Sequence, residues 1–181
     1  MTAQGFAVYD TPIGHCGIVW DDHAVIGSQL PQADAESTRA RVRRRFPAAA
    51  EREPSPQARE CVEAVRALLL GGDPAVLRSV PLDLSRVPPF HARVYELVRT
   101  IPVGRTMTYG EVAAELGDPG SARAVGQAMG SNPFAPIVPC HRVVAAGGGK
   151  GGFSAHGGTR TKVRILEIEG VHLEEPTLFD L

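Results

Sequence analysis

The hydrophobic positions of the first thirty residues fall in short runs that are separated by polar, turn-forming residues. Three such runs cover residues 6–10, 16–20 and 24–30, with turn signals at 11–14 and 21–23. Short adjacent runs of this length, bounded by turns, are typical of strands that pair with their neighbours. The pattern therefore predicts a small antiparallel meander.

Further along, apolar residues recur every three or four positions, which is the spacing of a helix with one buried face. This spacing predicts helices over residues 37–46, 57–70 and 90–101. Gly71-Gly72 ends the second of these helices. Cys61 lies on its apolar stripe, which favours a place in the core over a chemical role.

The segments between these helices are predicted to be irregular. Residues 47–56 are rich in Ala, Pro and Glu and read as a loop, and residues 80–84 read as a short strand before a proline-rich joint. We place a domain boundary near Pro88. The predicted divisions are 1–87, 88–172 and an acidic tail, 173–181.

Two further helices are predicted beyond residue 107. Thr108 and Glu111 have the spacing of a capping box, which starts a helix that runs to about Leu116. Ser121 is expected to cap a second helix over 122–129 after a glycine-containing turn. Helix, short turn and helix outline a helix-turn-helix motif.

The second of these helices has an unusual composition for a reader of the major groove. Its exposed positions are mostly Ala, Gly and Ser, with the single arginine Arg123. Small residues let a backbone approach a narrow minor groove while one side chain is inserted into the base stack. The alternative is that the small residues only pack against another helix.

Composition bounds the class of the protein. The chain has 181 residues, a net charge of −1 and three cysteines, too few and too scattered for a disulfide framework. No apolar run is long enough to span a bilayer, and residues 1–5 do not start a secretory signal. We therefore expect a cytoplasmic protein that does not enter membranes.

The charge is unevenly distributed along the chain. Residues 86–170 carry 10 Lys or Arg against 6 Asp or Glu, a balance that permits a polyanionic partner. The basic run at 39–45 is more typical of a solvated helix face than of a DNA contact.

Histidine and cysteine also raise the question of a metal. His15, Cys16, His23 and Cys61 are the residue types that bind zinc, but they lack the paired spacing of a structural site. Neighbouring residues of a strand point to opposite faces, which separates His15 from Cys16. We predict no metal site.

The strongest candidate for chemistry is Cys140, which is followed by His141 after the proline-rich approach 136–139. A thiol becomes a nucleophile near neutral pH when a base or a positive charge stabilises its thiolate. Adjacent side chains diverge, so the two groups are expected to communicate through a water molecule. The alternative is an inert pair in the core, since cysteine is commonly buried.

Three elements stand together in the second half of the chain: Tyr109, the run Arg123-Ala124-Val125-Gly126, and Asn132-Pro133 leading to Pro139-Cys140-His141-Arg142-Val143. Over residues 88–170 the chain resembles the O6-alkylguanine-DNA alkyltransferases, or methylated-DNA–protein-cysteine methyltransferases. The resemblance implies an α+β protein. Its amino-terminal α/β domain would be ribonuclease H-like, and its carboxy-terminal helix-turn-helix domain would be winged-helix-like.

The resemblance also implies an activity, DNA repair by irreversible transfer of an alkyl group to the thiol from O6 of guanine, and from O4 of thymine. Cys140 is then the nucleophile, His141 its base through water, Glu169 the carboxylate that orients His141, and Tyr109 the proton donor to the departing base. Because a thioether has no leaving path, each molecule acts once. No metal or cofactor is implied.

The implied partner is double-stranded DNA that contains O6-alkylguanine, bound by a monomer with the damaged base flipped out. The implied DNA contacts are Thr108, Ser121, Ala122, Arg123, Ala124, Gly126 and Gln127. The implied contacts to the alkylated base are Asn132, Pro139, Val143, Phe153 and Ser154, with the carbonyls of Cys140 and Val143 meeting its exocyclic amine.

Other functions stay open at this stage. A sensor that binds alkylated guanine without chemistry would be a relative of the same family, although such relatives lack the cysteine. A cysteine hydrolase would need an oxyanion hole, which the sequence does not show. The loop 151–158 is about two residues longer than in better-known members, and Phe153 replaces a common tyrosine, so the accepted alkyl size is open.

The acidic end carries Thr177-Leu178-Phe179, which resembles the short motifs by which bacterial repair proteins bind the replication sliding clamp. The alternative is a tail that packs on its own domain.

Overall fold

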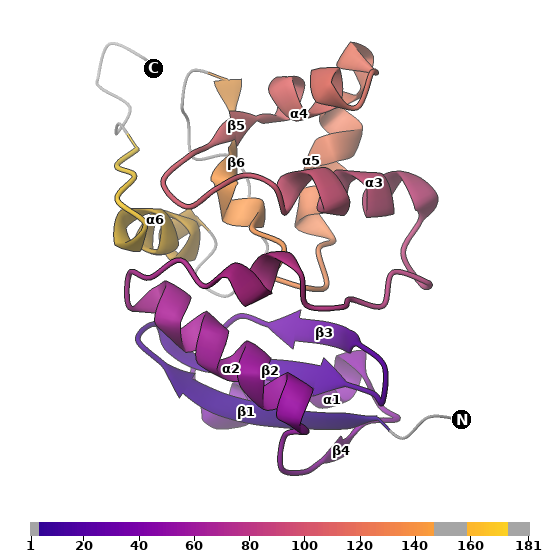
Figure 1. The fold of residues 1–181 in the computed structure, drawn as a ribbon, viewed down its shortest axis with the longest axis vertical. Coiled ribbons are helices and arrows are strands. Elements are labelled where there is room, and N and C mark those ends of the chain that lie inside the picture. Colours follow the sequence, from indigo (N-terminus) through magenta and orange to yellow (C-terminus); the bar gives the residue numbers. More distant parts are fainter. Residues whose placement is uncertain (1–3, 147–158, 174–181) are drawn as a thin grey trace. The chain divides into compact units, whose positions relative to one another are not determined.

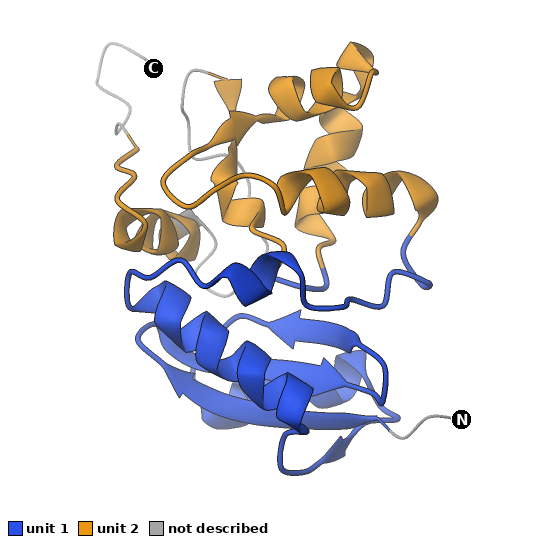
Figure 2. Cartoon of the chain, viewed as in Figure 1, with its two compact units in different colours: residues 1–87, 133–137 blue, residues 88–132, 138–181 orange. Residues whose placement is uncertain are grey.

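The computed structural model describes residues 4–146 and 159–173. The chain forms two compact units (Figure 2). Unit 1 comprises residues 1–87 and 133–137, and unit 2 comprises residues 88–132 and 138–181. The chain therefore leaves unit 2 after Asn132 and re-enters it at Val138, shortly before Cys140.

A small mixed sheet forms the middle of unit 1 (Figure 1). Its strands, in the spatial order β3-β2-β1-β4, are β1 (Gly5–Thr11), β2 (Gly14–Trp20), β3 (Val25–Gln29) and β4 (Ala50–Glu51). β2 pairs antiparallel with both β1 and β3, which confirms the predicted meander.

The expectation of a purely antiparallel sheet is wrong at β4, which pairs parallel with β1 inside the predicted loop 47–56. The pairing uses backbone groups, with Ala50 N–H donating to the Gln4 carbonyl and Arg52 N–H to the Phe6 carbonyl. Because backbone pairing at an open sheet edge needs no particular side chain, composition does not reveal so short a strand.

The helices α1 (Ala35–Arg45) and α2 (Pro56–Leu69) cover opposite faces of this sheet (Figure 1). Phe6 of β1 packs with Val42 of α1, whereas the ring of Tyr9 lies 5.6 Å from the guanidinium of Arg66 on α2. Successive strand side chains alternate between faces, which explains this division. Cys61 is fully buried, as its place on the apolar stripe of α2 predicts.

The predicted strand at 80–84 is reduced to a single bridge between Leu82 and Val25, and a 3-10 helix, Ala75–Arg78, comes before it. Val25 N–H donates to the Pro81 carbonyl at 2.9 Å, and Asp83 N–H donates to the Val25 carbonyl at 2.9 Å. Proline has no N–H to extend a ladder, which limits the pairing here.

Unit 2 is mainly helical, with one short parallel strand pair. Its elements are α3 (Pro89–Val98), β5 (Met107–Thr108), α4 (Tyr109–Glu115), α5 (Ala122–Gly130), β6 (Val143–Val144) and α6 (Thr159–Ile168). The expected capping box is present, since Glu111 N–H donates to Thr108 Oγ1 at 3.0 Å and Thr108 N–H donates to Glu111 Oε1 at 3.2 Å. Helix α6 was not anticipated from the hydrophobic pattern.

The prediction that the Ser121 side chain caps α5 is wrong. Ser121 occupies the N-cap position, but its hydroxyl donates to the Asp118 carbonyl at 2.7 Å. A 3-10 turn, Pro119–Ser121, joins α4 to α5 and directs the hydroxyl back into the turn. The helix-turn-helix outline itself is present.

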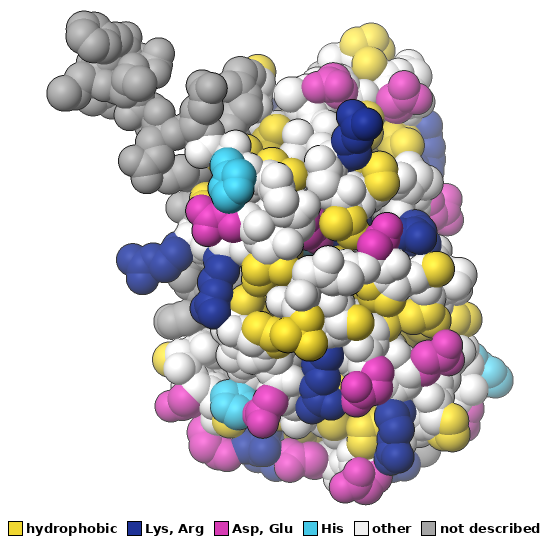
Figure 3. Space-filling model, turned by 60° about the vertical axis from the view of Figure 1, so that its left-hand side comes forward, with side chains coloured by type: hydrophobic (Ala, Val, Ile, Leu, Met, Phe, Trp, Pro, Cys, Tyr) yellow, Lys and Arg dark blue, Asp and Glu magenta, His cyan; other side chains and the backbone are white. Residues whose placement is uncertain are grey.

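The basic run of α1 is exposed at Arg41, Arg43 and Arg44, as expected for a solvated face, whereas Arg45 is partly buried. Figure 3 shows acidic and basic side chains interspersed on the face in view. Within residues 4–146 and 159–173, no group of three His, Cys, Asp or Glu residues could hold a metal ion. No helix in those ranges is long and apolar enough to cross a membrane.

A close contact between β3 and the end of α1 makes Gly27 the most constrained glycine of unit 1. A Cβ at Gly27 would lie 2.2 Å from Cζ of Phe46, whereas a Cβ at Gly130 of α5 would meet nothing within 4 Å. We expect Gly27→Ala to lower the free energy of unfolding by about 1–3 kcal/mol in urea titrations. Gly130→Ala should be neutral or stabilising by up to about 1 kcal/mol. Equal stabilities would contradict this packing.

Candidate active site around Cys140

Cys140 begins a short 3-10 helix, Cys140–Arg142, and is only 4% exposed. Its own N–H donates to the Val138 carbonyl at 2.8 Å, and Arg142 N–H donates to the Pro139 carbonyl at 2.9 Å. This tight turn sends consecutive side chains in different directions. In the part of the chain that the structure describes, no hydrogen bond joins the Cys140 thiol to the His141 ring.

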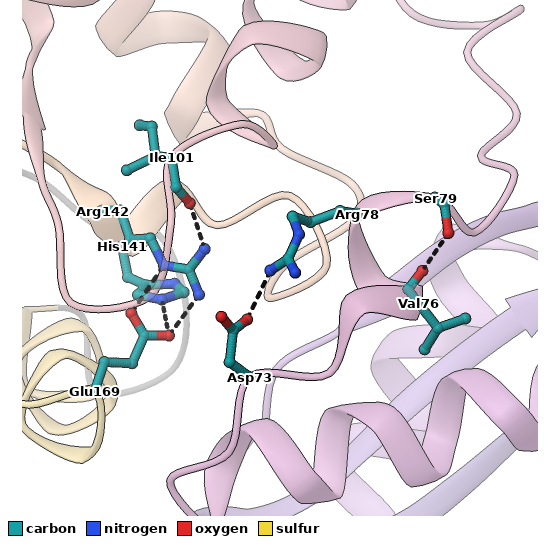
Figure 4. A network of polar contacts seen from close by, with 8 residues as sticks. All are labelled: Asp73, Val76, Arg78, Ser79, Ile101, His141, Arg142 and Glu169. Carbon is teal, nitrogen blue, oxygen red and sulfur yellow. Dashed lines mark hydrogen bonds and ion pairs between the residues drawn. The ribbon is translucent and has the colours of Figure 1, made fainter.

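A buried carboxylate ties His141 and Arg142 together (Figure 4). Glu169, immediately after α6, lies with Oε2 2.9 Å from His141 Nε2. Arg142 donates to both carboxylate oxygens at 2.8 Å and, through Nη1, to the Ile101 carbonyl at 2.8 Å. The site is thus assembled from α6, the 3-10 helix and the end of the α3 segment.

The protonation state of this group follows from its contacts. Burial raises the pKa of Glu169, but the hydrogen bonds from Arg142 and His141 outweigh it and bring the pKa to about 2. Burial lowers the pKa of His141, against the opposing effect of Glu169. Near neutral pH, therefore, Glu169 is a carboxylate and His141 is a neutral imidazole.

The tautomer of His141 is then determined. A carboxylate only accepts hydrogen bonds, so Nε2 must carry the proton and donate it to Glu169. Nδ1 is left with a free lone pair. It is buried and has no hydrogen-bond partner among the residues that the structure describes. His141 can therefore accept a proton at Nδ1.

The Cys140 thiol experiences opposing influences. Burial raises its pKa, while a hydrogen bond from the Asn132 side chain, the charge of Lys162 and the backbone N–H groups of Cys140 and His141 lower it. Burial is the largest of these effects, so the pKa stays above its ordinary value. The thiol needs a base to become a nucleophile.

Lys162 on α6 is a fully buried cation that sequence reasoning missed. Its Nζ donates to the Val143 carbonyl at 2.7 Å and lies 5.9 Å from the centre of the Tyr109 ring. Burial lowers the pKa of Lys162 to about 8, partly offset by Cys140, so the side chain is charged at neutral pH.

A signal for Lys162 was available in the sequence. Lys162, Ile165, Leu166 and Glu169 have offsets of 0, 3, 4 and 7, which put them on one helix face. All four are buried. A lysine and a glutamate on an otherwise apolar stripe indicate buried charges with specific partners.

Tyr109 is held near Cys140 by the strand pair. β5 and β6 pair in parallel, Met107 with Val143 and Thr108 with Val144, and Tyr109 follows directly as the first residue of α4. The ring is half-buried, and burial together with the proximity of Cys140 raises the pKa of its phenol. Gly126 of α5 lies beside this ring.

Tyr95 is a second tyrosine near Cys140, and the sequence pattern assigned it no role. It is almost fully buried on α3, its hydroxyl donates to the Ala128 carbonyl at 2.7 Å, and burial followed by the influence of Cys140 raises its pKa. The contact ties α3 to α5 and so supports the helix-turn-helix.

Six of the seven predicted DNA contacts lie on α5 or at its N-cap, and the seventh, Thr108, caps α4. Arg123 and Gln127 are exposed, and the smaller residues are partly exposed: Ser121, Ala122, Ala124 and Gly126. Thr108 is partly exposed as well, although its hydroxyl is engaged in the capping box.

The predicted contacts to the alkylated base are only partly placed. Asn132 Nδ2 donates to the Val138 carbonyl at 2.9 Å, and Pro139 is buried next to Cys140. The carbonyl of Cys140 accepts from Val143 N–H and that of Val143 from Lys162, and each retains a second lone pair. Phe153, Ser154, the rest of the 151–158 loop and residues 174–181 lie outside the described residues.

Comparison with known proteins gives the site a context. Residues 89–171 match a family described as 6-O-methylguanine DNA methyltransferase, DNA binding domain. The "Methylated-DNA--protein-cysteine methyltransferase" of Methanothermobacter thermautotrophicus is 34% identical over 163 residues, which cover 90% of this chain and 84% of that protein. The chain belongs to the 6-O-methylguanine DNA methyltransferase family. The resemblance stated from the sequence is thereby confirmed.

Mycobacterial members of this family have a higher sequence identity to this chain, over a shorter stretch of it. The protein of the same name from Mycobacterium tuberculosis is 49% identical over 102 residues, which span 56% of this chain and 60% of that relative's length. The "Crystal structure of Mycobacterium tuberculosis OGT in complex with DNA" superposes with a TM-score of 0.74 at 33% identity, covering 91% of this chain and 92% of that one. The family fold therefore extends over both units.

The depressed pKa of Glu169 makes a prediction about acid stability. A carboxylate whose pKa falls on folding stabilises the fold above its unfolded pKa, and that stabilisation is lost as the pH falls through about 2. In urea titrations between pH 5 and pH 2, we expect this group to account for a loss of roughly 3 kcal/mol. Glu169→Gln should lack this component of the pH dependence.

The same variant leaves buried Arg142 without its counter-ion, so at pH 7 it should be less stable by about 3–5 kcal/mol. Glu167→Gln, at an exposed position in the last turn of α6, is the matched control and should behave as the unsubstituted protein. An identical acid profile for Glu169→Gln and Glu167→Gln would show that the carboxylate is not paired as described.

Proposed function

We propose that this chain repairs DNA by transferring an alkyl group, chiefly methyl, from O6 of guanine to Sγ of Cys140. The observation that carries the proposal is a buried thiol next to an imidazole whose Nε2 is occupied by Glu169 and whose Nδ1 is free to take a proton. Membership of the 6-O-methylguanine DNA methyltransferase family supports the substrate class. O4 of thymine is a second substrate oxygen in this proposal.

The first step produces the nucleophile. The thiol proton passes through a bridging water molecule to Nδ1 of His141, and Glu169 stabilises the imidazolium that forms. The Asn132 hydrogen bond and the charge of Lys162 stabilise the thiolate, as their effects on the Cys140 pKa indicate. Separate residues thus take the thiol proton and stabilise the thiolate, which explains how the thiol can ionise although it is buried.

The second step is a displacement at the alkyl carbon. A carbon–sulfur bond forms, the carbon–oxygen bond to the base breaks, and its electron pair stays with guanine. Tyr109 supplies a proton to the departing base, and the neighbouring Lys162 cation lowers the cost of the phenolate that results. The product thioether has no leaving path, so one molecule of protein repairs one lesion.

DNA binding is assigned to α5 and the turn before it. The alkylated base lies inside the duplex, and extruding it costs about a few kcal/mol. Exposed Arg123 fills the position that the base vacates, and the small residues around it allow a close approach to the minor groove. The similarity of this chain to M. tuberculosis OGT, which was crystallised in complex with DNA, supports DNA as the partner.

The proposal includes finer assignments that rest on the family resemblance. Unit 1 is ribonuclease H-like, unit 2 is winged-helix-like, and the protein acts on double-stranded DNA as a monomer without a cofactor. Three buried cysteines outside disulfide bonds fit a reducing compartment such as the cytoplasm. Binding of the acidic tail to a sliding clamp is a secondary hypothesis, for which deletion of residues 175–181 is the test.

The central prediction concerns the mass of the protein. After incubation with a duplex that contains one O6-methylguanine, the intact protein should gain one methyl group, which peptide mapping should place on Cys140. Cys140→Ala should gain nothing, and a second addition of substrate should give no further turnover. Tight lesion binding without a mass change would favour a sensor, and methylation of Cys16 or Cys61 would contradict the assigned site.

The proposed role of Arg123 in base extrusion can be distinguished experimentally from a non-specific attraction between positive charge and DNA. Arg123→Ala should slow transfer from duplex DNA by about tenfold or more, the equivalent of at least about 1.4 kcal/mol of extrusion energy. Transfer from a single-stranded oligonucleotide, in which the base is already accessible, should change little. Arg160→Ala, an exposed arginine on α6, is the control. An equal loss on both substrates would contradict a role in base extrusion.

A further inference from the structure

Arg45 differs from the other arginines of the basic run in α1. It is partly buried, and its guanidinium lies 4.9 Å from the Phe46 ring. Within the described residues it has no carboxylate partner, and its hydrogen bonds go to oxygens that carry no formal charge. A partly buried cation without a counter-ion is costly, so the contacts that it makes call for an explanation.

Those contacts converge on one end of β3 and on Pro133. Nη1 of Arg45 donates to the Ser28 carbonyl at 3.0 Å and to Gln29 Oε1 at 2.8 Å, and Nη2 donates to the Pro133 carbonyl at 3.2 Å. Ser28 N–H donates to the same Pro133 carbonyl at 2.8 Å. β3 is an edge strand of the sheet, so this N–H is available for a partner outside the sheet.

The position of Pro133 in the chain connects these contacts to the surroundings of Cys140. Pro133 directly follows Asn132, whose side chain donates to the Val138 carbonyl and is hydrogen-bonded to Cys140. Residues 133–137 form a detour into unit 1, and Asn132 closes that detour at its base. Arg45 and Ser28 both donate to the carbonyl of Pro133, the residue after Asn132. These two hydrogen bonds restrict the backbone rotations that would redirect the Asn132 side-chain amide.

We propose that Arg45 is a positioning residue for the nucleophile: by holding the Pro133 carbonyl, together with Ser28 N–H, it keeps Asn132 directed at Val138 and at the Cys140 thiol. The effect passes along the chain, through the peptide bond that joins Asn132 to Pro133. The effect on repair rests on the proposed function, whereas the effect on the thiol does not. Arg45 is suited to this task because one guanidinium reaches three acceptors at once.

The test uses iodoacetamide as a probe of the thiol in the full-length protein, without DNA. The rate of carbamidomethylation at Cys140 is measured by peptide mass spectrometry as a function of pH, for Arg45→Met and for the exposed neighbour Arg44→Met. Loss of the Asn132 hydrogen bond should slow the Arg45→Met reaction at pH 7 by about tenfold, the weight of one hydrogen bond to a charged group. The midpoint of its pH profile should move upward, and Arg44→Met should match the unsubstituted protein.

Two further measurements distinguish a change in the reactivity of Cys140 from a loss of folding. Circular dichroism verifies that each variant is folded at the temperature of the assay, and Arg45→Lys, which retains the charge but reaches fewer acceptors, should react at an intermediate rate. Cys140 reactivity in folded Arg45→Met equal to that in Arg44→Met would overturn the proposal. If Arg45→Met does not fold, wild-type reactivity of Arg45→Lys would overturn it. Absence of alkyl transfer from DNA in all variants would count against the proposed function. The rate of the iodoacetamide reaction at Cys140 would still test the role of Arg45, because it is measured without DNA.

Discussion

The carboxylate of Glu169 is the group on which the rest of the site depends. It neutralises Arg142, orients His141 and, by accepting from Nε2, leaves the lone pair of Nδ1 available. Because Arg142 also binds the Ile101 carbonyl, the same charge holds the end of the α3 segment. A single buried anion thus anchors two side chains of the 3-10 helix, His141 and Arg142, and determines which nitrogen of the imidazole carries the proton.

Burial gives this arrangement both its cost and its usefulness. In water, a thiol, an imidazole, a lysine and a carboxylate would titrate near their ordinary pKa values. Inside unit 2 burial raises the pKa of Cys140 and lowers those of His141 and Lys162, while two hydrogen-bond donors hold Glu169 ionised. The neutral thiol is therefore stable until a base takes its proton, which would suit the proposed role of Cys140 as a nucleophile that reacts once and must not be consumed by other electrophiles.

The chain alternates between the two units close to Cys140. Residues 133–137 belong with the sheet of unit 1, yet they lie between Asn132 and Val138, which unit 2 holds together through a side-chain hydrogen bond. An edge strand that would otherwise expose unpaired backbone groups is used here to bind the detour. The same hydrogen bonds that complete the sheet edge can in this way restrict the motion of residues close to Cys140 in the chain.

Local patterns in the sequence were sufficient for the elements whose signals are local: the meander, the helices of unit 1, the capping box at Thr108 and the Cys140-His141 motif with its family resemblance. They could not reveal β4, which depends on an open backbone edge, or the true partner of the Ser121 hydroxyl. The pairing of Arg142 with Glu169, the burial of Lys162 and the inward turn of Arg45 were decided only in the tertiary structure. Their partners are distant along the chain, and a charge reveals its role only when folding removes it from water and brings it to its partner.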